Sequence, residues 1–123
     1  MRAKKNLELG YQRLLYYRHK NGGFSAFGLD KENGSTWLTA YVARGFHMAK
    51  EFIQIDDDVI TSALNFIIEK QTPSGNFEEQ GDIFEQFDDQ GLSLSAFVCL
   101  ALMENVVSIV PIKAIIFVYE NIN

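Results

Sequence analysis

The sequence predicts an all-α fold of stacked helical hairpins, with about five helices. The first observation is a spacing of apolar residues at i, i+3, i+4, i+7 and i+8, which lines one stripe of a helix. This template occurs four times, beginning at Leu7, Leu38, Ile60 and Leu94. The second observation is that helix, Gly-x-Phe turn and helix follow one another twice. Because one helix pair does not bury its own apolar stripes, such repeats stack side by side.

The first hairpin is expected over about residues 5–51. Its first helix, at 5–19, ends where paired glycines permit the left-handed backbone that terminates helices. Ser35 and Thr36 then provide hydroxyl caps for a second helix at 36–51. The apolar stripes are Leu7, Gly10, Tyr11, Leu14 and Leu15 in the first helix and Leu38, Tyr41, Val42, Gly45 and Phe46 in the second. Of the second stripe, we expect Leu38, Tyr41, Val42 and Phe46 in the core.

The second hairpin is expected over about residues 57–104, with its second helix at 92–104. Asp56 is the expected N-cap of the first helix, because a carboxylate suits the free N–H groups and the positive dipole at a helix start. This cap places Ile55 and Ile60 at the two ends of a hydrophobic staple.

The turns of the two hairpins repeat one another. Arg-x-x-x-Gly-x-Phe at 18–24 matches Gln-x-x-x-Gly-x-Phe at 71–77, at an offset of 53 residues. Such turns between helices are typical of α/α toroids, in which hairpins form an outer and an inner ring. A third hairpin would start at about 111–123, where Pro111 is favourable in a first helical turn. The sequence therefore predicts a single domain over residues 1–123, a partial α/α toroid.

Composition and charge exclude several classes of protein. A chain of 123 residues that is 47% apolar buries one core. The net charge of −5 disfavours a nucleic-acid partner, because binding phosphates needs a basic face. The most hydrophobic run, at 106–119, is interrupted by Pro111 and is shorter than the roughly 20 residues of a membrane-spanning helix. We therefore expect no membrane insertion, and the basic N-terminus lacks the apolar core of a signal peptide.

Candidate catalytic and metal-binding residues are few. His19, His47 and the single cysteine, Cys99, do not have the spacing of metal ligands, so we expect structural roles for them. The carboxylates at 56–58 could bind magnesium with a diphosphate or protonate an alkene, but helix capping accounts for them. The acidic residues at 78–89 lack the alternating spacing of a calcium loop. We therefore expect no catalytic residue, no cofactor and no metal.

Four blocks of the sequence resemble the thioester domain of the alpha-macroglobulin and complement superfamily, with insect thioester-containing proteins closest in character. The resemblance implies an α/α toroid in an extracellular protein of innate defence or protease inhibition. Its implied partners are the other domains of the parent chain and, through them, protein or microbial-surface targets. The blocks, in the family's order, are Gly-Tyr-Gln-Arg at 10–13, Gly-Phe-Ser-Ala-Phe-Gly at 23–28, Ser-Thr-Trp-Leu-Thr-Ala-Tyr-Val at 35–42 and Gln-Thr-Pro-Ser-Gly-Asn-Phe at 71–77.

The chain departs from the family pattern at the residues that carry the chemistry. The Gly-Cys-Gly-Glu-Gln motif, whose cysteine and glutamine form the reactive thioester, is missing and would lie upstream of Met1. Glu85 occupies the position that matches the catalytic histidine of complement-like members. A carboxylate, with an ordinary pKa of about 4.3, is a weak base at neutral pH. We therefore expect a scaffold or binding fragment that is not an enzyme.

Asn33 begins the N-glycosylation sequon Asn-Gly-Ser in a predicted loop, where a glycan could be accommodated if the chain is secreted. Two alternatives to the leading hypothesis stay open. One is a fragment of an α/α-toroid enzyme, such as a terpenoid cyclase or a prenyltransferase-like protein. The other is a non-catalytic interaction module of this length. An aspartate-rich or zinc-ligand pattern upstream would favour the enzyme, and Gly-Cys-Gly-Glu-Gln after macroglobulin domains would favour the leading hypothesis.

Overall fold

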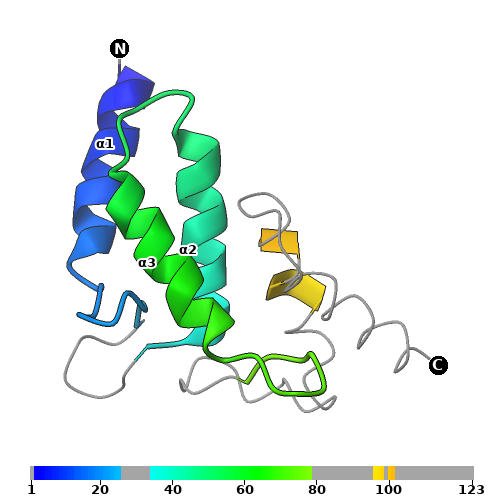
Figure 1. The fold of residues 1–123 in the computed structure, drawn as a ribbon. Coiled ribbons are helices and arrows are strands. Elements are labelled where there is room, and N and C mark those ends of the chain that lie inside the picture. Colours follow the sequence, from blue (N-terminus) through cyan, green and yellow to red (C-terminus); the bar gives the residue numbers. More distant parts are fainter. Residues whose placement is uncertain (1, 26–33, 79–95, 99, 102–123) are drawn as a thin grey trace.

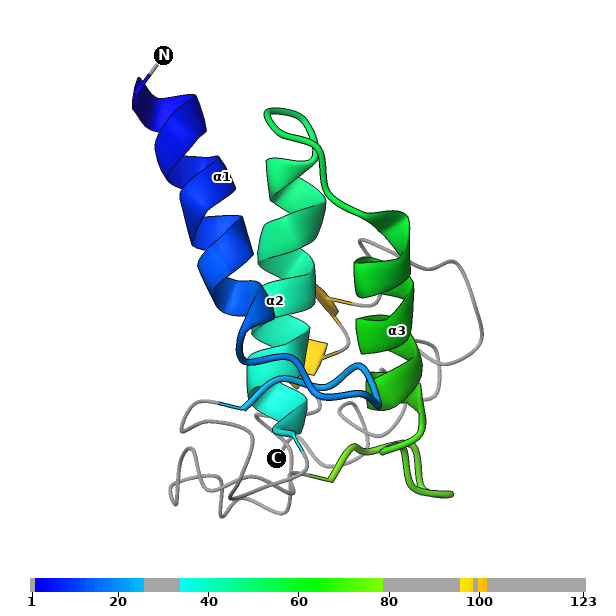
Figure 2. The same ribbon diagram turned by 90° about the vertical axis from the view of Figure 1, so that its left-hand side faces the viewer.

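The computed structural model describes residues 2–25, 34–78, 96–98, 100 and 101. It contains helices α1 (Arg2–Leu15), α2 (Thr36–Ala49) and α3 (Asp57–Ile68), and residues 96–98, 100 and 101 are also helical. Within these ranges the chain forms no strand, so the all-α prediction is confirmed. The helix expected from residue 111 lies outside the described residues. In Figures 1 and 2, α2 lies next to both α1 and α3.

Helix α2 begins where the sequence predicts. Gly34 has a φ of 115°, which glycine adopts without steric cost, and the chain turns there into the helix. The hydroxyl of Ser35 then accepts a hydrogen bond from the Leu38 amide at 3.1 Å, so Ser35 is the N-cap. The helix ends at Ala49, two residues before the expected end, and residues 51–56 link it to α3.

The buried face of α2 differs from the expected stripe. Val42 and Phe46 are buried, but Tyr41 and Gly45 are exposed and Leu38 is half-buried. The expectation is therefore confirmed for Val42 and Phe46 and wrong for Tyr41. Apolar spacing predicts a helix, but it does not determine which residues a neighbouring helix covers. The buried residues of this helix are Thr36, Thr39, Ala40, Val42, Ala43 and Phe46.

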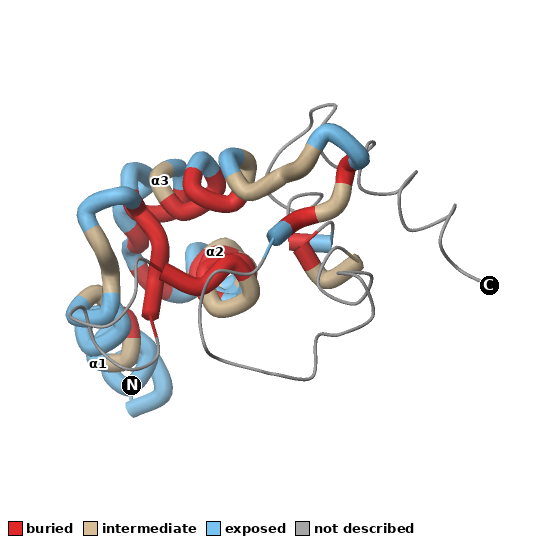
Figure 3. Tube along the Cα trace, turned by 90° about the horizontal axis from the view of Figure 1, so that it is seen from below, coloured by how far each residue is buried: buried red, intermediate tan, exposed pale blue. Residues whose placement is uncertain are grey.

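Helix α3 packs against α2 and follows the prediction closely. The side chain of Asp56 accepts a hydrogen bond from the Asp58 amide at 2.9 Å, which confirms Asp56 as the N-cap. Ile55 and Ile60 are both buried, as expected of a hydrophobic staple. Figure 3 shows buried residues where α2 and α3 face each other. The buried residues of α3 are Val59, Ile60, Ala63, Leu64, Phe66 and Ile67.

Helix α1 contributes far less to the core than its apolar stripe predicts. Tyr11 is its one buried residue, while Leu7 and Leu14 remain exposed. The ring of Tyr11 meets Phe46 edge-on at 5.0 Å between centroids, and its hydroxyl accepts a hydrogen bond from the Asp56 amide at 3.1 Å. Leu15 is half-buried against the same core, and most of the surface of α1 is exposed in Figure 3.

Candidate functional site

The two Gly-x-Phe turns adopt the same backbone structure. In the first, the His19 amide donates to the Gly23 carbonyl at 2.8 Å, and 53 residues later the Thr72 amide donates to the Asn76 carbonyl at 2.8 Å. The glycine between them has a positive φ in both turns, 93° at Gly22 and 102° at Gly75. The repetition seen in the sequence is therefore a repetition of structure.

Glycine is required in the first turn because the turn rests directly on α3. A Cβ atom on Gly23 would lie 2.7 Å from the ring of Phe66, closer than real Cβ contacts. A Cβ atom on Gly22 would lie 2.4 Å from the backbone oxygen of Ser62. Gly34 approaches the same Phe66 ring, at 3.0 Å from its would-be Cβ. Phe66 lies outside the apolar stripe, so sequence periodicity gave no signal for this contact.

Hydrogen bonds connect the turn to the block Ser-Thr-Trp-Leu-Thr-Ala at 35–40. The amide of Phe24, whose side chain is fully buried, donates to the hydroxyl of Thr39 at 2.8 Å. The Ser35 amide in turn donates to the Phe24 carbonyl at 2.8 Å. Two of the blocks that resemble the thioester domain are thus held together by buried hydrogen bonds. No pattern in the sequence indicates the role of Thr39, because its partner Phe24 lies in another segment.

A further bond connects the first turn region to the second. The hydroxyl of Thr36, at the first position of α2, donates to the backbone carbonyl of Glu78. Trp37 stacks on Tyr41 at 5.3 Å and on Phe97 at 5.7 Å between ring centroids, so α2 also contacts the helical segment at 96–98. Through these contacts the block at 35–42 lies where the first hairpin meets residues 78 and 97 of the second sequence repeat.

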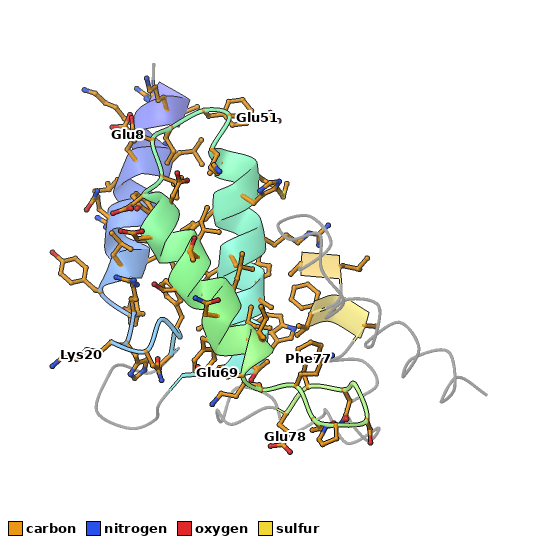
Figure 4. All side chains as sticks on the ribbon, viewed as in Figure 1. Glu8, Lys20, Glu51, Glu69, Phe77 and Glu78 are labelled. Carbon is orange, nitrogen blue, oxygen red and sulfur yellow. The ribbon has the colours of Figure 1, made fainter. Side chains whose placement is uncertain are left out.

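The predicted reactive residues do not assemble into a catalytic or metal site within the described part of the chain. His19 hydrogen-bonds the Ser25 hydroxyl inside the turn. His47 is half-buried in the last turn of α2. Asp57 forms a surface ion pair with Lys50 at 3.5 Å. In the described ranges, no three His, Cys, Asp or Glu side chains are grouped to hold a metal ion. Labelled carboxylates in Figure 4 lie at both ends of the helix layer, Glu8 and Glu51 at one end and Glu69 and Glu78 at the other.

The structure does not describe the remaining predicted site residues. Glu85, Asn33 and Cys99 lie outside the described residues, as does most of the helix expected at 92–104. No helix in the described ranges combines the length and hydropathy needed to cross a membrane. The described geometry is therefore that of a packing junction built from glycine turns, buried hydroxyls and aromatic rings.

Comparison with known proteins identifies what this junction belongs to. The sequence profile of the A-macroglobulin TED domain matches residues 1–120. Ovostatin of Gallus gallus is 40% identical over 99 residues, which cover 77% of this chain and 7% of ovostatin. The chain thus spans a small part of the length of that relative. The resemblance predicted from the four sequence blocks is confirmed. The chain belongs to the A-macroglobulin TED domain family.

Proposed function

We propose that this chain is a fragment of a thioester-containing alpha-macroglobulin or complement-like protein, acting there as a scaffold or binding domain. The observation that carries the proposal is the family match over residues 1–120, together with the 7% of ovostatin that the chain covers. A domain of this size within a longer chain serves the parent protein, which we place outside the cell in protease inhibition or innate defence. Its partners are then the neighbouring domains of the parent.

Within this proposal the chain is divided into a hairpin at about 5–51, a second at about 57–104 and the start of a third at about 111–123. The matching turns around Gly22 and Gly75 support the first two units, since each turn follows the first helix of its hairpin. The junction formed by Thr36 and Glu78 supports their direct stacking.

The proposal includes the absence of acyl-transfer activity in the chain itself. The reactive thioester requires the Gly-Cys-Gly-Glu-Gln motif, which does not occur in these residues, and Glu85 stands where the family's catalytic histidine would be expected. We expect no covalent incorporation into the purified chain of labelled glycerol, which would form a hydroxylamine-sensitive ester, or of labelled methylamine, which would form a stable amide. The measurement is scintillation counting of the denatured protein.

Two variants make this experiment specific. Cys99→Ser removes the only cysteine, so any label that depends on a thiol ester would disappear in that variant. Glu85→His restores an imidazole, and we expect it to remain inactive because no thioester is present to react. Thiol-dependent covalent labelling of the unmodified chain by either nucleophile would refute the proposal.

A further inference from the structure

The sequon Asn-Gly-Ser at 33–35 lies where the chain enters α2, and the sequence contains no second sequon. Gly34 and Ser35 are the two of its residues that the structure describes. Both are buried, and Ser35 is 0% exposed. An enzyme that attaches a glycan to this motif must reach the serine hydroxyl as well as the asparagine. The folded chain therefore hides a group that the enzyme recognises.

The polar groups of Ser35 are all used by the first hairpin. Its hydroxyl accepts a hydrogen bond from the Leu38 amide at 3.1 Å. Its amide donates to the Phe24 carbonyl at 2.8 Å, and its carbonyl accepts from the Thr39 amide at 2.9 Å. Presenting the hydroxyl to an enzyme therefore requires the start of α2 to open and these bonds to break.

Gly34 is enclosed by two other segments of the chain. A Cβ atom on it would lie 3.0 Å from the ring of Phe66 in α3 and 3.3 Å from the Cα atom of Gly23 in the first turn. The backbone of the sequon is therefore closed by tertiary packing as well as by the helix cap. Phe66 comes later in the chain than the sequon, so this packing cannot form until α3 has been synthesised.

We propose that Asn33 is an N-glycosylation site that accepts its glycan only before the first hairpin packs against α3. This inference rests on the proposed function, since the chain must enter the secretory route to meet the enzyme. The donor is an oligosaccharide linked to a lipid diphosphate. Transfer forms a bond between the side-chain nitrogen of Asn33 and the first sugar carbon, breaks the bond from that carbon to the diphosphate, and releases the lipid diphosphate and one amide proton. Folding of residues 34–39 ends the reaction.

The first experiment tests modification of the nascent chain. The 123-residue chain is translated behind a cleavable signal sequence in a cell-free system that contains endoplasmic-reticulum microsomes. We expect one added glycan, removable by endoglycosidase and absent from the Asn33→Gln variant. A chain that enters the microsomes without gaining a glycan, while a reporter glycoprotein in the same reaction is modified, would overturn the inference.

The second experiment tests whether folding closes the site. The chain is purified from bacteria without a glycan and incubated with purified oligosaccharyltransferase and the lipid-linked donor, and intact mass gives the rate. Thr39→Val keeps residues 33–35 but removes the acceptor of the Phe24 amide, so it should be modified about fivefold faster or more, because the rate follows the open population. Gly23→Ala, which crowds the Phe66 ring, should also be faster. Thr61→Val, exposed on α3, should match the unmodified chain.

Equal rates for the unmodified chain, Thr39→Val and Gly23→Ala would show that the folded sequon is open and would overturn the inference. The outcome is separable from that of the labelling experiment with glycerol and methylamine. If the nascent chain gains no glycan and neither nucleophile is incorporated, the modification site is rejected and the proposed function stands. Thiol-dependent labelling together with glycosylation of the nascent chain would reject the function and leave the modification site.

Discussion

The amide of Phe24 donates to the hydroxyl of Thr39 at a point where both residues are fully buried. We predict that Thr39→Val, which keeps the shape but removes the acceptor, lowers the free energy of unfolding by about 1–3 kcal/mol. The reason is that the Phe24 amide would lose its partner in a site without water access. Urea titration followed by circular dichroism measures the change. Thr61→Val is the control, because Thr61 is exposed on α3 and should change stability by less than about 0.5 kcal/mol.

A glycine-to-alanine substitution can be tested at a crowded position, Gly23, and at an open one, Gly10. A Cβ atom on Gly23 would collide with Phe66 at 2.7 Å, so Gly23→Ala should destabilise the fold by about 1–3 kcal/mol. Gly10→Ala meets open space inside a helix and should stabilise the chain by about 0.5–1 kcal/mol. Thermal melts of the two variants give the comparison. Destabilisation of equal size in both would contradict the assigned contacts.

Only part of this residue-level detail could be predicted from the sequence. Ser35 and Asp56 were predicted as caps, because a cap depends on neighbours along the chain. The roles of Thr39 and Phe66 could not be predicted, because their partners lie in other segments and neither residue belongs to an apolar stripe. Glu85 and Asn33, the predicted positions for lost catalysis and for glycosylation, stay predictions.

The three helices were predicted in type and approximate position. The bounds of α1 were wrong, because it runs over Arg2–Leu15 and not over 5–19, and the extent of burial was not predicted. The spacing of apolar residues predicts that a helix has an apolar stripe. It does not indicate whether another element covers that stripe. In α3 the stripe residues Ile60, Ala63, Leu64 and Ile67 are buried and Ile68 is half-buried. In α1 the same pattern is largely exposed, at Leu7 and Leu14.

This difference in burial predicts a difference in local stability. Helix α1 buries one side chain, Tyr11, whereas α3 buries six. We expect the amides of α1 to exchange with solvent faster than those of α3 by about a factor of ten or more, because local opening of α1 exposes little apolar surface. Hydrogen exchange measured by mass spectrometry resolves the two helices. Equal protection of α1 and α3 would show that α1 is held by contacts other than Tyr11.

For the molecule as a whole, the family and the all-α class were predictable because repeated blocks in a fixed order carry that information locally. How the two repeats meet was not predictable. The bond from the Thr36 hydroxyl to the Glu78 carbonyl and the stacking of Trp37 on Phe97 join segments that are far apart in the chain. Such contacts depend on the relative position of whole elements, which periodicity does not specify.

The central claim is that, within the described residues, α1 and α2 present an exposed apolar face formed by Leu7, Leu14, Tyr41 and Met48. Sedimentation velocity over a range of concentrations, combined with a thermal melt, tests it most directly. We expect reversible self-association and a broad, marginal melt, because exposed apolar surface of this kind favours association. The double variant Leu7→Glu with Met48→Glu should reduce the association. The charge-matched control Gln54→Glu with Thr61→Glu should not, since both control residues are exposed polar residues outside that face. A compact monomer at every concentration with a sharp cooperative melt would contradict the claim.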